Sequence, residues 1–563
     1  MKEIIRKLIQ GVLTDLESKV NVEILVDYPK NEQFGDYTTN VAMMLAKKMG
    51  KNPMETANRI ISNLKFPISN FFEKVEAVEP GYINFYLSPK YFWDKVEEIN
   101  KLKVAFGDSP SKEKKVMIEY SQPNTHKEFH IGHLRNVIIG SAIVATTRKA
   151  GYPVVAANYF GDIGSHIAKC LWGLEKFHAD ENLEKIPDRA EFLGKVYSEA
   201  VQAIEKNPEL ENEFKDLQNK LESGDEKLTE LWKKTREWSL GEFDRIYEIL
   251  GVKFDALFYE SQEEQAGIKI LPELIEKGIA KESQGAIIAD LEKYGLGVLV
   301  LRRKDGSVLY GLKDIPLAIE KFDKYKIDRS VVITDVRQSF YFRQLFKILE
   351  LYGFRKQMCH VGFEAVSLKG GEMMSSRKGN VVTAQKIFSE MIRKVKDQFL
   401  GAPYPEEIAL GAVKFFMLKY SSDSRIEFDM DEALKLEGAT GPYVQYAHAR
   451  ICSILSKAGS EKLKSQKQAN FSLLSRGKEI GLMRELNKFP ELVEEIGESY
   501  EVHKLPHYAI RLADKFHSFY DECRVIDEAK PELTQARIEL ISATRIVLAE
   551  TLRLIGVGAP ARM

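Results

Sequence analysis

The sequence predicts an α/β protein built around one parallel sheet, with a small α/β domain before it and an all-α domain after it. The chain has 563 residues, 44% of them hydrophobic and 29% charged, which is too long for one core and too apolar for a disordered chain. Four apolar runs resemble buried strands, and beyond residue 405 apolar residues recur almost only at helical spacing. We therefore expect three domains, over residues 1–105, 106–404 and 405–563.

The N-terminal segment mixes two patterns. Apolar residues recur at helical spacing over residues 4–20 and 41–64, and a proline interrupts the second run. The runs VNVEILVDY (20–28) and GYINFYLS (81–88) have the composition of strands. These patterns predict a compact α/β module.

The central segment has the pattern of a nucleotide-binding unit. The strand-like run at 116–122 leads through a tight turn into a helical pattern, which is how such units open. Comparable runs occur at 154–160, 330–336 and 360–366, and we expect all four to form one parallel sheet. Residues 171–250 are rich in Glu and Lys at helical spacing, which predicts a helical insertion that splits the sheet.

Composition limits the location and the partners of the chain. The first residues contain no uninterrupted apolar run for a signal peptide or a membrane span, so a cytoplasmic protein without membrane contact is expected. The four cysteines lie far apart without a CxxC pair, which argues against a disulfide framework and a zinc ribbon, and no protein-held metal is expected. The net charge of −1 excludes a global basic field, so any RNA must be recognised by local patches, stacking and shape.

The sharpest local feature is PNTHKEFHIGHLRN, residues 123–136, at the end of the first predicted strand. His130 and His133 would lie at a helix N-terminus, where amide groups and the helix dipole favour a polyphosphate, and Gly132 would let ATP approach the backbone. The two imidazoles could donate hydrogen bonds to phosphate oxygens as charge develops. Two histidines one turn apart can also bind a metal or cap the helix, and the short motif alone does not decide between these roles.

The longer pattern SxPNxxKxxHxGHLRN resembles the first signature of class I aminoacyl-tRNA synthetases, in the form that the arginine enzymes carry. Gln122 stands where many relatives have serine. The resemblance implies a Rossmann-type catalytic sheet and a second signature on a loop after the last strand. GGEMMSSRKGNVV, residues 370–382, lies at that place, although by itself it could be a simple loop rich in Gly and Ser.

The second signature departs from the general pattern KMSKS. The second lysine of that pattern, which stabilises the leaving pyrophosphate, aligns here with Ser376. Lys127, three residues before His130, could supply the missing cation, and arginine enzymes that lack the loop lysine resemble this arrangement. Lys378 remains on the loop, as a secondary phosphate contact or as a solvated side chain. The residues expected at the nucleotide and in catalysis are Lys127, His130, Gly132, His133, Met374, Ser375, Ser376 and Lys378.

A pocket that selects arginine needs acceptors around a planar guanidinium and an aromatic face. Tyr310 and Asp314 are four residues apart in a helical pattern and share one face, although such a pair is more often ordinary surface or core. The arginine enzymes carry a YxxxD element at this place, followed after the next strand by a glutamine, here Gln338. The same match implies that Glu119 and Asn124 bind the amino or guanidinium group of the substrate. Without the resemblance, these two would be a strand-edge hydrogen-bonding group and a helix cap.

Two further segments resemble the tRNA-binding parts of the arginine enzymes. The N-terminal domain resembles the addition that approaches the tRNA elbow, where Tyr82 and Asn84 could contact an extruded base. Both could equally lie on the wetter face of an alternating strand. Residues 437–450 match most of EGxTGPYxQYAHAR from the anticodon-binding bundle. In that stretch Tyr443 and Tyr446 are candidate platforms for anticodon bases, or core residues.

The resemblance implies an arginyl-tRNA synthetase activity. Such an enzyme activates L-arginine with ATP and Mg²⁺, and transfers the arginyl group to the terminal adenosine of tRNA(Arg), often only after the tRNA has bound; a monomer is expected. A site built for a guanidinium rejects lysine strongly, so no β-rich proofreading module is expected. Two alternatives stay open: another class I synthetase or adenylyl-transferring enzyme, and a catalytically silent tRNA-binding paralogue. Ile163 and His166, where relatives often have Trp and Gln, leave the contacts near them open.

Overall fold

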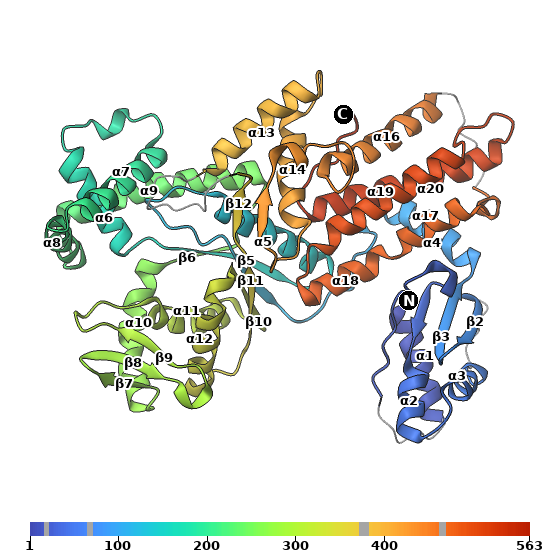
Figure 1. Cartoon of the computed structure of the whole chain (residues 1–563), viewed down its shortest axis with the longest axis horizontal. Helices are drawn as coiled ribbons and strands as arrows, with labels where there is room; N and C mark the ends of the chain where they lie inside the picture. Colours follow the sequence, from blue (N-terminus) through green and yellow to red (C-terminus); the bar gives the residue numbers. More distant parts are fainter. Residues whose placement is uncertain (16–21, 65–70, 371–381, 461–468) are drawn as a thin grey trace.

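The structure, a computed structural model, describes residues 1–15, 22–64, 71–370, 382–460 and 469–563. Figure 1 shows a central sheet, a helical insertion at one end of the molecule, and the N-terminal and C-terminal domains at the other end. None of the described helices is both long enough and apolar enough to cross a bilayer.

The central sheet has five parallel strands in the order β11-β10-β4-β5-β6. The predicted α/β class and the four predicted strands are confirmed, with differences at their ends. The first strand ends three residues earlier than expected, the third lies one residue earlier, and the fourth begins and ends three residues earlier. The edge strand β6 has only four residues and was not predicted. The strands are β4 (Val116–Glu119), β5 (Val154–Phe160), β6 (Ala256–Tyr259), β10 (Arg329–Asp335) and β11 (Gln357–Phe363).

The chain reverses its direction of travel across the sheet at β4. From β4 it moves outward to β5 and β6, and it then returns to the other side of β4 to form β10 and β11. In open parallel sheets a ligand crevice forms at the carboxyl ends of the strands where the order reverses. The helices that follow β4, β6 and β10 begin at this edge: α5 (Ile131–Lys149), α10 (Glu260–Glu276) and α12 (Ser339–Tyr352), with α11 (Tyr310–Tyr325) beside them.

Residues 171–250, where a helical insertion was predicted, are mostly helical, and the helical segment begins before them at Ser165. It consists of α6 (Ser165–Phe177), α7 (Arg189–Lys206), α8 (Leu210–Glu222) and α9 (Glu226–Leu250), which share a separate apolar core. Beyond it lies an unpredicted antiparallel sheet of three short strands, in the order β7-β8-β9. The strands are β7 (Ala280–Ser283), β8 (Ala286–Asp290) and β9 (Val298–Arg302).

The N-terminal domain packs α2 and α3 against an antiparallel sheet of order β1-β3-β2, with α1 beside α3. The strand predicted at 81–88 is confirmed as β3, but the one predicted at 20–28 is wrong for the described residues 22–28, which form only an isolated bridge between Asp27 and Thr38. The elements are α1 (Lys2–Asp15), β1 (Tyr37–Thr39), α2 (Val41–Met49), α3 (Pro53–Ser62), β2 (Phe72–Val78) and β3 (Tyr82–Leu87), followed by α4 (Pro89–Leu102).

The C-terminal domain is a helical bundle, as predicted. Between the main sheet and the bundle lies a short parallel pair of strands, β12 (Val366–Leu368) and β13 (Ile426–Phe428). The helices are α13 (Ala384–Gln398), α14 (Pro405–Leu418), α15 (Met430–Ala433), α16 (Gly441–Ser460), α17 (Gly477–Asn487), α18 (Phe489–Ser499), α19 (Lys504–Glu522) and α20 (Pro531–Leu554).

Helix α5 connects the sheet edge to this bundle. Its residues are buried on almost every side, which explains why its sequence shows no amphipathic pattern. Near its C-terminus, Lys149 is buried and forms a 2.9 Å ion pair with Glu550 of α20, and Ala150 packs so closely on α18 that a Cβ on Gly497 would lie 2.4 Å from it. Helix α5 is therefore one buried element that joins the catalytic sheet to the bundle, beside contacts such as the 3.0 Å hydrogen bond from Arg329 of β10 to Tyr500.

Candidate active site

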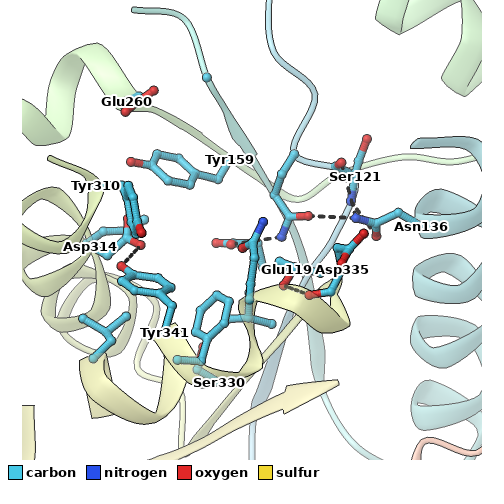
Figure 2. Close-up of a pocket in the computed structure, with 18 of the residues that line it drawn as sticks. Glu119, Ser121, Asn136, Tyr159, Glu260, Tyr310, Asp314, Ser330, Asp335 and Tyr341 are labelled. Atoms are coloured by element: carbon cyan, nitrogen blue, oxygen red, sulfur yellow. Dashed lines mark hydrogen bonds between the residues drawn. The ribbon is translucent and has the colours of Figure 1, made fainter. Parts of the chain in front are cut away.

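A cavity of about 700 Å³ opens at the carboxyl ends of β4, β5 and β10 (Figure 2). It gathers side chains from segments more than 200 residues apart in sequence, because parallel strands end at the same edge. Of the residues predicted for the nucleotide and for arginine, eight line this cavity: Glu119, Asn124, His130, Gly132, His133, Tyr310, Asp314 and Gln338.

His130 and His133 form one wall of the cavity, at the N-terminus of α5. The Nδ1 atom of His130 accepts a hydrogen bond from the Gly132 amide at 3.0 Å, and the Nδ1 atom of His133 accepts from the His130 amide at 3.3 Å. The two rings stack with their centroids 3.9 Å apart. A Cβ on residue 132 would lie 2.9 Å from the His130 ring, so this compact arrangement requires glycine.

These contacts fix the tautomer of both imidazoles. Burial, and secondarily the charge of Lys127, lowers the pKa of His130 to about 4, and burial holds the pKa of His133 well below its usual value. Both rings are therefore neutral at pH 7, and because each Nδ1 accepts a hydrogen bond, the proton is on Nε2. The helix-cap role left open for the pair is confirmed for His130, and it leaves two Nε2–H donors for an anion.

The turn after β4 carries backbone strain. Ser121 and Gln122 have positive φ values of 81° and 44°, a conformation that L-residues keep only when neighbouring contacts enforce it. Their amides donate to the side chains of Asn136 at 3.1 Å and Asn158 at 3.0 Å. The strained turn is thus fixed by side chains from α5 and β5, at the point where the two halves of the cavity meet.

Asn124 follows this turn and does not cap the helix, because the N-cap of α5 is His130. Its segment is bonded to the end of β5: the Gly161 amide donates to the Pro123 carbonyl at 3.2 Å, and the Thr125 amide donates to the Gly161 carbonyl at 3.0 Å. A Cβ on Gly161 would lie 2.2 Å from the Asn124 amide oxygen, so the side chain rests directly on glycine backbone. These contacts hold Asn124 in the lining of the cavity.

The opposite half of the cavity is lined by carboxylates and tyrosines. The Tyr341 hydroxyl donates to the Asp314 carboxylate at 2.5 Å, and the Tyr310 and Tyr341 rings meet edge to face at 4.6 Å. Burial raises the pKa of Asp314 to about 7; the Tyr341 hydrogen bond and Lys321 lower it, while Glu119 and Glu260 raise it. The predicted pair Tyr310 and Asp314 therefore does line one face of α11, with an unpredicted tyrosine against it.

Glu119 is buried, and its role is more than strand-edge bonding. Its carboxylate forms a 2.5 Å ion pair with Lys321 of α11 and accepts a hydrogen bond from the side-chain amide (Nε2) of Gln122 at 3.2 Å. Gln122 in turn accepts at its side-chain oxygen from Asn136 at 2.9 Å. Gln122, noted as a departure from the usual serine, therefore links the carboxylate half of the cavity to α5.

Lys127 lies outside the main cavity. It lines two smaller cavities between the sheet edge and the insertion, and its ammonium lies 5.1 Å from the centre of the Tyr197 ring of α7. It is nevertheless close enough to lower the pKa of both site histidines. Its phosphate role stays a prediction.

Met374, Ser375, Ser376 and Lys378 lie outside the described residues, so their predicted roles stay predictions. Where the chain is described again, Thr383 forms a backbone bridge with His130, and the Ala384 amide donates to the Phe129 carbonyl at 2.9 Å. Gln385 donates to Glu242 of α9 at 2.6 Å. The segment that follows the second signature is thus bonded to the first signature and to the insertion.

The residues predicted to meet tRNA have different environments. Tyr82 and Tyr446 are 40% and 41% exposed. Asn84 is 3% exposed and its amide oxygen accepts from Thr38 at 2.6 Å, so the expectation of a wetter face is wrong for this residue. Tyr443 donates to Asp514 of α19 at 2.6 Å, so it is engaged within the bundle.

Sequence reasoning missed several residues of the cavity. Tyr159 is the penultimate residue of β5 and Lys321 lies seven residues after Asp314 on α11, which puts it on the same helical face. Tyr341 lies one turn after Gln338. The helical spacing could have indicated Lys321 and Tyr341, whereas the position of Tyr159 depends on where β5 ends.

The fold and the site together define a class I aminoacyl-tRNA synthetase. The family "tRNA synthetases class I (R), catalytic domain" matches residues 95–401, "Arginyl tRNA synthetase N terminal domain" matches residues 3–87, and "DALR anticodon binding domain" matches residues 444–563.

The chain belongs to the arginyl-tRNA synthetase family. It is 33% identical to an arginine–tRNA ligase of Exiguobacterium sibiricum, over 99% of both chains, and 34% identical to one of Clostridioides difficile, over 97% of both chains. Among solved structures, the Thermus thermophilus arginyl-tRNA synthetase superposes over the whole of both chains with a TM-score of 0.84 at 26% identity.

Proposed function

We propose that this protein activates L-arginine with MgATP to arginyl-adenylate and transfers the arginyl group to the terminal adenosine of tRNA(Arg). The observation that carries this proposal is one cavity with two neutral imidazole donors at a helix N-terminus on one side, and buried carboxylates with tyrosine rings on the other. The first side suits a polyphosphate and the second suits a guanidinium.

In the activation step, the arginine carboxylate attacks the α-phosphate of ATP and pyrophosphate leaves. The Nε2–H groups of His130 and His133 donate to phosphate oxygens, and they gain strength as negative charge grows in the transition state. Because the neutral rings carry no charge, they stabilise the leaving group by oriented dipoles and the α5 N-terminus rather than by ion pairing. Lys127 and the loop residues Ser375, Ser376 and Lys378 would add charge and hydrogen bonds, with Met374 beside the nucleotide.

In the arginine half, we assign the guanidinium to Asp314 and the face of Tyr310. Glu119, Asn124 and Gln338 would hold the α-amino group and the rest of the substrate. Lysine offers three donors from one atom and cannot fill acceptors spaced for a planar fork, so a buried acceptor stays unpaired.

The tRNA would contact both terminal domains. Tyr82 and Tyr446 are exposed aromatic side chains, which suits stacking on unpaired bases. Tyr443 and Asn84 would have to exchange their present hydrogen bonds for contacts with RNA. We further infer that the enzyme acts as a cytoplasmic monomer, and that tRNA must bind before arginine is activated.

Charging of purified tRNA mixtures with each amino acid in turn tests the proposed function. The expected result is esterification of arginine alone, dependent on ATP and Mg²⁺. Charging with another amino acid would favour a different class I synthetase. Rapid pyrophosphate exchange with arginine and ATP alone would contradict the tRNA requirement but leave the activity in place.

The variant Lys127→Ala separates an active enzyme from a silent tRNA-binding paralogue. An enzyme should lose much of its activation rate, whereas a pure binder has no rate to lose. Lys169→Ala is a matched control, because Lys169 lines one of the same small cavities as Lys127 but belongs to the insertion. Equal rates in Lys127→Ala and the wild-type enzyme would remove Lys127 from the mechanism.

A further inference from the structure

Two buried side-chain oxygens in the carboxylate half of the cavity have neither a hydrogen-bond nor an ion-pair partner among the described residues, whereas Oε2 of Glu119 is paired with Lys321. The two oxygens are Oη of Tyr159, from the end of β5, and Oδ1 of Asp314, from the first turns of α11. Buried polar atoms are almost always paired in folded proteins, and leaving them unpaired costs stability. Because two such acceptor atoms lie in one cavity, we infer that a ligand with hydrogen-bond donors binds there and pairs with them.

The Tyr159 side chain extends across the cavity toward the end formed by Glu260, Tyr310 and Asp314 (Figure 2). Burial, and the nearby carboxylates of Asp314 and Glu260, hold the pKa of Tyr159 well above its usual value, so the phenol stays protonated. A phenol oxygen accepts with its lone pairs and also donates its O–H. Tyr159 can therefore accept from a cationic N–H while its own proton is directed to a carboxylate.

Tyr341 fixes the other side of Asp314. Its hydroxyl occupies Oδ2, so Oδ1 is the carboxylate oxygen left for a ligand. The buried Tyr341 ring is held edge to face against Tyr310 and Phe342, which limits its rotation. Tyr341 thus orients the carboxylate without needing to touch the ligand.

We propose that Tyr159 contacts the substrate guanidinium directly, by accepting one of its N–H groups, and that Tyr341 is the positioning residue that presents Asp314 to the same group. This inference rests on the proposed function and adds two residues that determine specificity. A planar guanidinium has donors on three nitrogens and reaches Asp314 and Tyr159 together, whereas the single nitrogen of lysine reaches only one of them at good geometry.

The test compares Tyr159→Phe with Tyr325→Phe in arginine charging. The variant Tyr325→Phe also removes only a hydroxyl group, but Tyr325 is the last residue of α11 and does not line the cavity. Tyr159→Phe should raise KM for arginine about tenfold or more, because a hydrogen bond from a charged donor is lost. The values of kcat and of KM for ATP should stay close to those of the wild-type enzyme, and Tyr325→Phe should change none of the three.

Inhibition of arginine charging by agmatine, which carries the guanidinium but no carboxylate, shows whether the Tyr159 hydroxyl acts on the guanidinium end of the substrate. The inhibition constant of agmatine should rise by the same factor in Tyr159→Phe, measured on protein with an unchanged melting temperature. An unchanged KM for arginine, or an equal rise in KM for ATP, overturns the contact. If the wild-type protein charges no tRNA with arginine, the proposed function fails; if it does and Tyr159→Phe behaves like wild type, only this inference fails.

The positioning role of Tyr341 has its own readout. Besides Tyr341, the charged groups with the largest effect on Asp314 are Lys321, Glu119 and Glu260, and Glu263 interacts with it more weakly. Tyr341→Phe removes the hydrogen bond that favours the ionised carboxylate, so the pH of half-maximal arginine binding should move upward. A purely structural role would lower the melting temperature and leave this pH unchanged, and that outcome overturns the assignment.

Discussion

Arginine binding should depend on pH through Asp314. Burial raises the pKa of this carboxyl group to about 7 in the empty cavity, and a guanidinium binds the ionised form. Its apparent affinity is therefore reduced by the ionised fraction of Asp314. That fraction is roughly one eleventh at pH 6 and ten elevenths at pH 8, which predicts a Kd about tenfold lower at pH 8.

Calorimetric titration of L-arginine at pH 6, 7 and 8, at constant ionic strength, measures this change directly. Binding should release protons near pH 7, so the observed heat should vary with the ionisation enthalpy of the buffer. Asp314→Asn should bind arginine weakly, with a flat pH profile. Burial and the neighbouring Glu320 also raise the pKa of Glu263 to about 7; since Glu263 does not line the cavity, Glu263→Gln is the control that should keep the profile.

A wild-type Kd that is constant from pH 6 to pH 8 would refute this reasoning, as would a tenfold change that persists in Asp314→Asn. If the pH dependence of the Kd for arginine disappears in Glu263→Gln, the titrating group is Glu263 and not Asp314. The same pKa shift has a consequence for stability. Because the folded-state pKa is raised, Asp314 destabilises the fold progressively as pH rises from about 4 toward 7, and Asp314→Asn should raise the melting temperature more at pH 8 than at pH 5.

Three further predictions concern other parts of the molecule. His130→Ala should lower the rate of tRNA-dependent pyrophosphate exchange by ~10²-fold; since the pKa of His130 is about 4, a rate loss that varied with pH between 6 and 8 would contradict the neutral donor. Tyr446→Ala should raise KM for tRNA about tenfold by loss of stacking and leave KM for arginine and ATP unchanged; a change in the latter two would indicate a structural effect. Lys149→Met should lower the free energy of unfolding in urea by about 2 kcal/mol, because the buried Glu550 loses one of its two described ion-pair partners and Asp108 loses its ion pair with Lys149; wild-type stability would show that this buried cluster is neutral.

The sequence predicted the catalytic sheet well, because the central strands β4, β5 and β10 are apolar and buried almost throughout, which leaves a clear pattern. It missed β6, a strand of four residues, and the sheet β7-β8-β9, whose short strands alternate with turns. The run at 20–28 has strand composition, but among its described residues, 22–28, only Asp27 has a bridge partner, Thr38 of β1, a strand of three residues. Strand formation depends on an available partner, which composition does not encode.

The sequence predicted those parts of the site in which a motif holds several functional residues within a few positions of one another. His130, Gly132 and His133 are close in sequence and close in space. Tyr159 and Tyr341 belong to different strand and helix ends, and their approach to Asp314 depends on the order of strands in the sheet. The fixed tautomers of the histidines also depend on hydrogen-bond geometry, which no sequence pattern gives.

Helix α5 is held at both ends, with the two histidines at its N-terminus and buried contacts with the bundle at its C-terminus. Its 19 residues span about 28 Å, and its far end is clamped by α18 and by the Lys149 to Glu550 ion pair. A tilt of roughly 2° at that clamp displaces the imidazoles by about 1 Å, a misplacement that can change a reaction rate ~10²-fold. If the bundle binds tRNA as proposed, a small tilt of α5 would be enough to carry a change in the bundle to the imidazoles.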